Sequence, residues 1–359
     1  MPSIRPRTPF ICAQCTRALR SRRSASSRNA HTSSPAAYSK DKVSAKPDET
    51  AQPVPPRPSV VPLQKLNYYW ETIPPTSRQL AYTSQFFHNP NPNFLCSANA
   101  FREFPLSDVP EVAFLGRSNV GKSSLLNAVF GRHNKPIAHT SSKPGRTKTM
   151  NAFGIGGGEY GVRLLQKTQQ EHPKVIGRGG LVVVDMPGYG KGSREAWGTE
   201  ILKYLRERRQ MRRAFLLVDA EHGLKPGDLQ ILDIMQQNAT PHQVILSKVD
   251  KIISPNGRET SQRVMDKRLK HLREVCDSIR KVLQPHGQRG LSALGEILAC
   301  SSEYSHQGER LGIDGVRWAV LQAVGLGCGT DGFLRNPDIK EAAMPIIPPI
   351  KSAQMAKEQ

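Results

Sequence analysis

Short apolar runs and amphipathic segments alternate through the middle of the chain. Five runs have the length of buried strands: Val112–Leu115, Leu181–Val184, Phe215–Val218, Val244–Leu246 and Ile297–Cys300. The segments with helical spacing are Ser123–Phe130, Arg194–Met211, Gly227–Gln237, Glu259–Leu283 and Arg310–Val324. Strands and helices that alternate in this way predict an α/β fold, in which helices cover both faces of a parallel sheet.

The segments outside this pattern differ in composition. Residues 1–40 contain seven Arg and no Asp or Glu, which predicts a disordered mitochondrial transit peptide and a location in the matrix. A disordered RNA-binding arm is the alternative for this segment. Residues 41–63 have the composition of a Pro-rich linker, and we expect residues 64–110 to be an N-terminal extension packed on the folded core. Residues 156–180 contain three consecutive Gly and predict an insert, either a long loop or a hairpin, while residues 326–359 predict a disordered tail.

Charge narrows the choice of partner. The formal net charge is +21, and because residues 1–40 hold eight basic residues, the rest of the chain is still basic by 13. Such a balance favours a polyanionic partner such as nucleic acid or an anionic surface. No apolar run approaches the roughly 18 residues of a membrane-spanning helix. The six scattered Cys favour a reducing compartment, and the CxxC of Cys12 and Cys15 lacks a second pair of metal ligands nearby.

A glycine-rich loop follows the first predicted strand and matches GxxxxGK[ST]. Its residues, with the Ser after them, are Gly116, Arg117, Ser118, Asn119, Val120, Gly121, Lys122, Ser123 and Ser124. Glycines let the backbone N–H groups wrap a phosphate closely, and the start of a helix adds positive potential. Lys122 would contact the β- and γ-phosphates of a nucleotide, and the Ser123 hydroxyl would bind Mg²⁺. A glycine turn before a helix is the structural alternative.

Two further motifs follow buried strands downstream of this loop. Asp185 ends the run Leu181–Val184 and is followed three residues later by Gly188. An acid in this place can hold Mg²⁺ through water, and the Gly188 N–H can bond the γ-phosphate and respond to its loss.

Ser247, Lys248 and Asp250 follow the run Val244–Leu246, in the place of an NKxD motif. The Asp250 carboxylate can accept two hydrogen bonds from guanine, whereas adenine has no matching donors, so GTP or GDP is the predicted ligand. Lys248 can pack its stem over the base. Ser247 replaces the usual Asn and reaches less far, and Ser301 and Ser302 fit a loop whose backbone N–H faces the guanine carbonyl.

Together these residues resemble the EngB family of GTPases. The matching segments are Pro110–Ser124, Lys143–Thr147 and Asp185–Gly190, and the resemblance spans about residues 91–324. It implies a P-loop NTPase fold of the Ras-like type at residues 111–325, with a mostly parallel, six-stranded sheet and helices on both faces.

The resemblance also implies roles for single residues. Thr147, beside Gly145 and Arg146 in the first switch segment, would bind Mg²⁺ in the GTP state and act in catalysis with Lys122 and Gly188. Asn119 would coordinate K⁺. Tyr189 stands where Ras-like proteins keep a water-orienting Gln, which implies slow intrinsic hydrolysis of about 10⁻⁴ to 10⁻² per second.

Basic residues gather around the end of one predicted helix and along another, and they favour contacts with RNA phosphates over a merely solvated face. They are Arg206, Arg208, Arg209, Arg212 and Arg213 on one, and Arg263, Lys267, Arg268, Lys270, Arg273, Arg280 and Lys281 on the other.

With the leader, the resemblance implies a monomeric GTPase switch in assembly of the mitochondrial large ribosomal subunit or in mitochondrial translation, with rRNA as partner. A GTP-binding RNA scaffold with negligible turnover and a GTPase that regulates a non-ribosomal process are the alternatives.

Overall fold

The computed structural model describes the central part of the chain with several gaps. The described residues are 63–88, 92–132, 135–138, 149–166, 172–190, 195–255, 261–284, 293–306 and 309–334. The predicted transit peptide, the linker up to residue 62 and the tail beyond residue 334 lie outside them. Among the described helices, none combines the length and the apolar character that crossing a membrane requires.

A central eight-stranded sheet organises the fold, with strand order β1-β11-β10-β9-β4-β8-β5-β2. The strands are β1 (Tyr68–Tyr69), β2 (Asn93–Ala98), β4 (Glu111–Gly116), β5 (Met150–Gly156), β8 (Gly180–Asp185), β9 (Met211–Asp219), β10 (His242–Ser247) and β11 (Ala293–Ala299). The run from β11 to β8 is parallel, whereas β1, β5 and β2 pair antiparallel with their neighbours. The sheet is therefore mixed, and the expectation of six strands was wrong.

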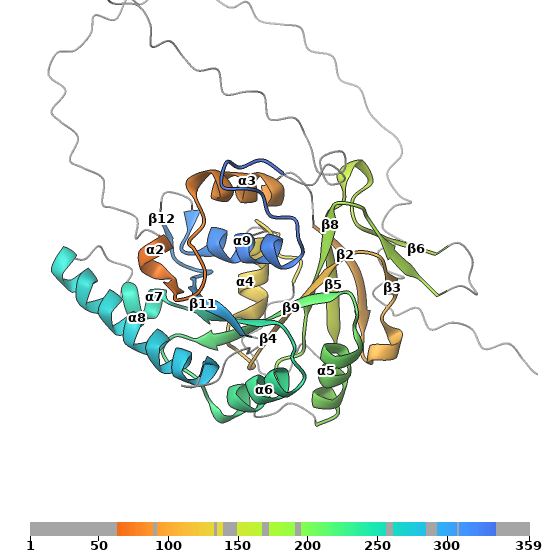
Figure 1. Ribbon diagram of the computed structural model, residues 1–359. Coiled ribbons are helices and arrows are strands. Elements are labelled where there is room, and N and C mark those ends of the chain that lie inside the picture. The colour runs from red at the N-terminus through yellow and green to blue at the C-terminus, as the bar shows by residue number, and fades with distance from the viewer. Residues whose placement is uncertain are drawn as a thin grey trace, which may run out of the picture. The chain divides into compact units, whose positions relative to one another are not determined.

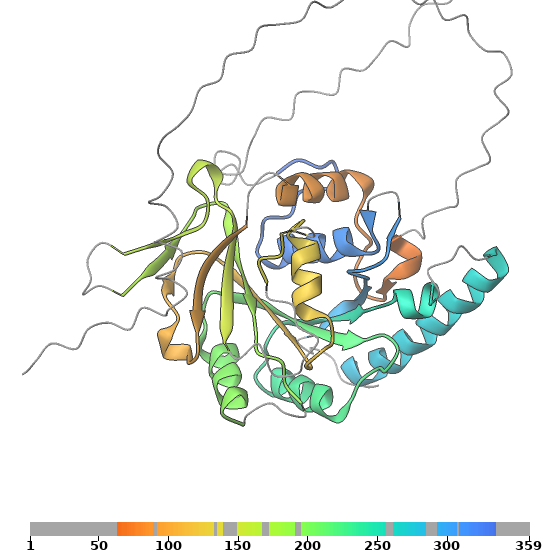
Figure 2. The same ribbon diagram turned by 180° about the vertical axis from the view of Figure 1, so that it is seen from behind.

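The parallel strands are buried on both faces, which explains their continuous apolar runs. In β4, Ala113 and Leu115 point into one core cluster, while Val112 and Phe114 point into a second. The first cluster is covered by α5 (Glu195–Glu207), α6 (Pro226–Gln237) and α8 (Gln262–Leu283), and the second by α3 (Ser77–His88), α4 (Lys122–Val129) and α9 (Ile313–Ala323). Figures 1 and 2 show these two sets of helices on opposite sides of the sheet.

The helix predicted over Arg194–Met211 is too long at its C-terminal end. Helix α5 ends at Glu207, and Met211 already pairs with Glu111 as the first residue of β9. The basic residues Arg212 and Arg213 therefore belong to a strand rather than to a helix end. The described residues also form two short helices, α2 (Leu63–Leu66) and α7 (Asp250–Ile253), and 3-10 turns at Phe101–Glu103 and Gly158–Tyr160.

Residues 64–110 contribute directly to the sheet. Strand β1 extends it beyond β11, and β2 extends it beyond β5. Between these strands, α3 packs on α9, where the Tyr82 hydroxyl donates to the Leu326 carbonyl at 3.0 Å. Thr72 also donates to the buried Glu296 carboxylate of β11 at 2.6 Å.

The glycine-rich insert contains a hairpin. Strands β6 (Arg163–Leu165) and β7 (Lys174–Ile176) pair antiparallel, and β7 pairs in parallel with β3 (Leu106–Ser107). Residues 167–171, between these two strands, lie outside the described part of the chain. A second small hairpin joins β12 (Ser305–His306) to β13 (Glu309–Arg310).

Candidate functional site

The glycine-rich loop runs from the end of β4 to the start of α4. Asn119 and Gly121 adopt φ of 66° and 92°, the left-handed region that turns successive N–H groups toward a common centre. At Gly116, a Cβ would lie 2.7 Å from Cγ1 of Val120, so any side chain would displace the loop. Left-handed residues and a glycine without room for a side chain are the features that a tight phosphate-binding loop requires.

Lys122 and Asp185 meet at the centre of this turn. Asp185 ends β8, which pairs in parallel with β4, so both residues arrive at the same edge of the sheet. The two side chains are 6% and 2% exposed and form a direct ion pair. The Ser123 hydroxyl lies 3.4 Å from the other oxygen of Asp185. Because each buried charge compensates the other, removing one of the two side chains alone lowers the free energy of unfolding.

These side chains fit a magnesium–nucleotide complex. Hydroxyl and carboxylate oxygens, here those of Ser123 and Asp185, are ligands that Mg²⁺ prefers. The Lys122 ammonium and the loop amides supply the positive potential that phosphates require.

Residues 188–190 are held against the phosphate-binding loop. The Ser118 N–H donates to the Tyr189 carbonyl at 3.1 Å, and a Cβ at Gly188 would lie 2.9 Å from the Ser118 hydroxyl. The Tyr189 hydroxyl donates to Asp228 at 2.7 Å, in the first turn of α6. Burial and the Asp228 charge raise the pKa of Tyr189 well above its usual value, so the phenol stays protonated. The Tyr189 side chain is therefore directed to α6.

The residues after β10 approach the same loop. The Ser247 hydroxyl is 4% exposed and donates to the Val120 carbonyl at 2.7 Å, so this short side chain does reach the loop. Lys248 has a φ of 57°, and its ammonium donates to the Asn119 carbonyl at 2.7 Å and to Asp219 at 2.9 Å. Burial opposes ionisation of Asp219, but the contacts with Lys248 outweigh it and lower the pKa of Asp219.

Asp250 is the first residue of α7 and is half-buried. Among the residues that the structure describes, none donates a hydrogen bond to its carboxylate, and two carboxylate oxygens can accept from guanine.

The last predicted loop needs a correction at Ser301. The Ser301 N–H donates to the Leu311 carbonyl at 2.9 Å, and its hydroxyl accepts from the Tyr304 N–H at 3.0 Å. Both groups of Ser301 therefore stabilise the turn after β11. The predicted residues Gly145, Arg146 and Thr147 lie outside the described residues.

Sequence reasoning missed two acids at this site, Asp219 and Asp228. Asp219 ends the buried strand β9 just as Asp185 ends β8, and that shared position was the available signal. Asp228 accepts from the Lys225 N–H at 2.8 Å as part of the cap of α6, and the fact that it also binds Tyr189 is visible only in three dimensions.

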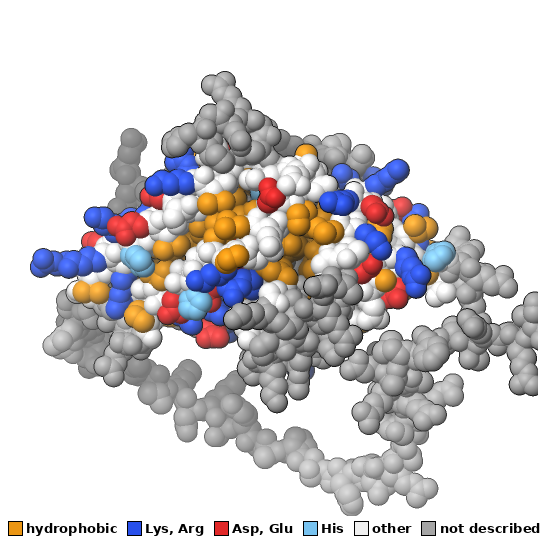
Figure 3. Space-filling model, turned by 90° about the horizontal axis from the view of Figure 1, so that it is seen from below, with side chains coloured by type: hydrophobic (Ala, Val, Ile, Leu, Met, Phe, Trp, Pro, Cys, Tyr) orange, Lys and Arg blue, Asp and Glu red, His pale blue; other side chains and the backbone are white. Residues whose placement is uncertain are grey.

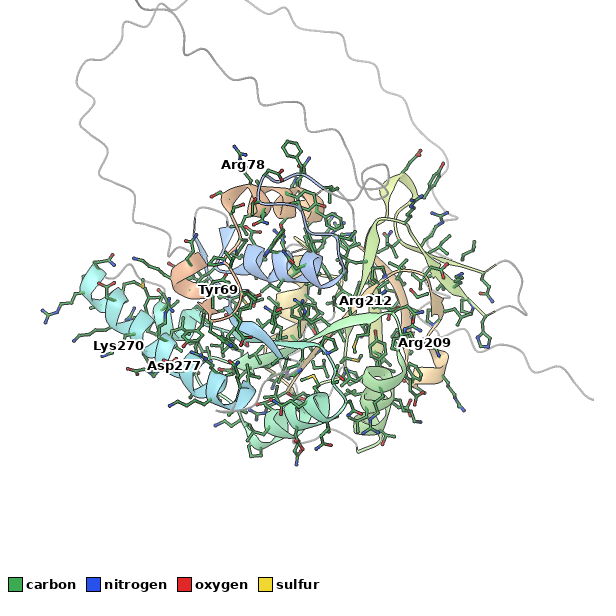
Figure 4. The ribbon with its side chains drawn as sticks, in the orientation of Figure 1. Tyr69, Arg78, Arg209, Arg212, Lys270 and Asp277 are labelled. Atoms are coloured by element: carbon green, nitrogen blue, oxygen red, sulfur yellow. The ribbon has the colours of Figure 1, made fainter. Side chains whose placement is uncertain are left out.

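The structure gives separate roles to the basic residues that were predicted to contact RNA. Arg208 forms an ion pair with the buried Glu111 at 2.6 Å, and Arg213 donates to Gln243 at 3.0 Å, so both have structural roles. Arg209 and Arg212 remain exposed, and Figure 4 shows them far from Lys270 on α8. The exposed basic residues therefore form two separate surfaces.

Comparison with known proteins places the sequence among guanine-nucleotide-binding proteins. Residues 111–248 match the sequence family described as 50S ribosome-binding GTPase. A probable GTP-binding protein EngB of Chelativorans sp. is 35% identical over 244 residues, which span 65% of this chain and 89% of that protein. Its counterpart in Bartonella bacilliformis is 33% identical over 249 residues, which span 68% of this chain and 97% of that protein.

Solved structures give weaker similarity. The crystal structure of a probable GTP-binding protein EngB has a TM-score of 0.33 and 18% identity, over 60% of this chain and 98% of that chain. Aquifex aeolicus Era bound to GDP and AlF4⁻ has a TM-score of 0.39 and 22% identity, over 60% and 57%.

Substitution of Ser247 tests the link between β10 and the loop. We expect Ser247→Ala to weaken GTP binding about fivefold, because the buried Val120 carbonyl loses a hydrogen bond worth about 1 kcal/mol. Titration with a fluorescent GTP analogue measures the change. Ser97→Ala is the control, since the exposed Ser97 bonds only to Asn151 among the described residues. An affinity that is unchanged in Ser247→Ala would contradict a role for this contact.

Proposed function

Because this chain belongs to the EngB family of GTP-binding proteins and is a GTPase, we propose that it acts as a switch in assembly of the mitochondrial large ribosomal subunit or in mitochondrial translation. One observation carries the proposal. Lys122, Asp185 and Asp250 all lie at or after the ends of strands that meet at the same edge of the sheet, in a chain whose matching family is described as 50S ribosome-binding. The basic surfaces and the basic leader are consistent with a ribosomal partner inside mitochondria.

The proposed nucleotide cycle uses the site residues named above. Lys122 would leave Asp185 to contact the phosphates, and the oxygens of Ser123 and Asp185 would hold Mg²⁺. The metal, when bound, neutralises charge on the β- and γ-phosphates. Asp250 binds the guanine edge, Lys248 covers the base, and Thr147 and Gly188 respond to the γ-phosphate. Loss of that phosphate would release both switch segments and with them the ribosomal particle.

Slow intrinsic hydrolysis is part of this proposal. The hydroxyl of Tyr189, which replaces a water-orienting Gln, is bound to Asp228 and is directed to α6. Asn119 is exposed at the rim of the loop and would bind K⁺, adding positive charge near the phosphates. GTP hydrolysis that is equally slow in K⁺ and in Na⁺, in the wild type and in Asn119→Ala, would rule out this use of K⁺.

Tyr189→Phe separates the structural role of this hydroxyl from a chemical one. We expect the variant to lose about 1.5–3 kcal/mol of stability, because the charged Asp228 carboxylate loses the hydrogen bond that Tyr189 donates. Turnover of GTP should stay within about twofold of the wild type, since the hydroxyl is bonded to Asp228 of α6. Thermal unfolding and single-turnover hydrolysis measure the two effects. A large loss of turnover in a folded variant would show that the hydroxyl takes part in the reaction.

Hydrolysis in the presence of ribosomal particles tests the switch. The full chain should release phosphate from GTP faster when mitochondrial large-subunit particles are added, and Lys122→Ala should release none with or without them. Tight GTP binding without turnover under any condition would favour an RNA scaffold instead. Stimulation by an unrelated RNA to the same extent would remove the ribosome from the proposal.

Import into isolated mitochondria tests the proposed location. The full chain should become protected from external protease in a manner that needs a membrane potential, whereas a chain without residues 1–40 should remain accessible. Equal protection of both chains would show that these residues do not direct import.

A further inference from the structure

An open groove lies between α7 and α8, beside the guanine-binding loop. It has a volume of about 360 Å³, and its walls include Ile252 of α7 and Val264 of α8. Figure 1 shows α7 directly beside α8, and in Figure 3 Lys and Arg side chains, with acids among them, surround an apolar centre. Nothing in the proposed nucleotide cycle uses this groove.

Four basic side chains line the groove: Lys251, Lys267, Arg268 and His271. The last three recur at spacings of three and four along α8 with Val264, so they lie on one face of the helix. One acid, Glu221, also lines it and is paired with Lys251 at 3.1 Å. With His271 neutral, the lining still carries two positive charges more than negative ones.

The basic groups differ in how firmly they are held. Arg268 donates one N–H to the Ile253 carbonyl at 2.7 Å, which joins α8 to α7 and fixes the guanidinium in place. Its remaining N–H groups can donate to a ligand. Lys267 is exposed and forms no ion pair with the residues that the structure describes. The groove thus combines one fixed donor group with one free ammonium, as phosphate recognition requires.

Three residues that line the groove lie next to nucleotide-site residues in the sequence. Lys251 and Ile252 follow Asp250 in the same short helix, and Glu221 lies two residues after Asp219, whose carboxylate binds Lys248. A ligand in the groove would therefore touch the two loops that surround the guanine base.

We propose that this groove binds the phosphodiester backbone of ribosomal RNA, an inference that rests on the proposed function and gives its RNA contact a location. A strand of phosphates matches cations placed in a row within a groove, and Ile252 and Val264 offer apolar contact to riboses or bases. A flat anionic membrane fits less well, because the exposed acids Asp266 and Glu274 lie on α8 close to the basic row and would be brought against it.

Charge reversal at one groove residue, with a matched control on the same helix, tests the proposal. Lys267→Glu changes the groove, whereas Lys270→Glu makes the same change three residues away, outside the lining and at a position labelled in Figure 4. The probe is a fluorescein-labelled fragment of mitochondrial large-subunit rRNA, and its anisotropy is titrated with the full chain at several salt concentrations.

The proposal predicts about tenfold weaker binding for Lys267→Glu than for Lys270→Glu, with a salt dependence reduced by about one phosphate contact. Both variants should hydrolyse GTP within twofold of the wild type, which shows that they are folded. Equal affinities of the two variants for RNA would contradict RNA binding in the groove while leaving the proposed function intact. A wild type that binds neither this RNA nor the ribosomal particle would instead contradict the proposed function.

One outcome would identify a different partner. If Lys267→Glu lost binding to vesicles that contain anionic phospholipid but kept its affinity for RNA, the groove would serve a membrane surface and the proposal would be wrong.

Discussion

Lys122→Ala is expected to weaken GTP binding by about a thousandfold and to abolish turnover. At about 4 Å, one unit charge on a phosphate contributes about 4 kcal/mol when the effective dielectric constant is near 20, as it is at partly buried sites. Lys122 is buried at the start of α4 and pairs with Asp185, so water screens its charge only weakly. Isothermal titration with GTP and Mg²⁺ gives the affinity, and phosphate release gives the rate.

The stability of this variant needs its own control. Without Lys122, the buried Asp185 charge has lost its partner, at a cost of about 3–5 kcal/mol. The double variant Lys122→Ala/Asp185→Ala removes both charges and should regain part of that stability without regaining GTP binding. A folded single or double variant that binds GTP within tenfold of the wild type would contradict the role of Lys122.

The second large effect is expected at Asp250, where substitution changes the preferred base. Asp250→Asn should weaken GTP binding by about a hundredfold or more, because two charge-assisted hydrogen bonds to guanine are lost. The Asn amide can instead donate to the carbonyl that xanthine carries in place of the guanine amino group, so XTP should become the better ligand.

Competition of GTP, XTP and ITP against a fluorescent GTP analogue measures this preference. Asp266→Asn makes the same chemical change on the exposed face of α8, where Asp266 accepts from Gln262, and should leave the order of ligands unchanged. An Asp250→Asn variant that still prefers GTP would show that the base is recognised elsewhere.

Burial explains which strands the sequence predicts. The five parallel strands lie between two layers of helices, so they are apolar at nearly every position and were predicted correctly. Strand β5 was missed because Gly154 and Gly156 interrupt its apolar pattern. Gly154 is required there because a Cβ at this position would lie 2.7 Å from the side chain of Val162. Strand β1 has two residues and depends on pairing with β11, a contact about 230 positions away.

More of the candidate site than of the sheet could be predicted from the sequence, because the site motifs follow buried strands in a fixed order. Parallel strands end at one edge, so Asp185, Ser247 and Asp250 are brought to the phosphate-binding loop by topology alone. The contacts between the motifs could not be predicted. That the N–H of Ser301 is taken by Leu311 follows from the turn after β11, which leaves no mark on the sequence.

Charge runs are ambiguous for a similar reason. Arg208 and Arg209 are neighbours in sequence, yet Arg208 neutralises the buried Glu111 while Arg209 is exposed. Only packing distinguishes a cation that stabilises the core from one that is available to RNA.

Co-sedimentation of the full chain with mitochondrial large-subunit particles is the most direct test of the central claim. The account predicts that the chain sediments with the particles when it holds a non-hydrolysable GTP analogue, dissociates with GDP, and fails to bind in the Lys122→Ala variant under either condition. Equal binding with the analogue, with GDP and without nucleotide would contradict a GTP-controlled switch on the ribosome.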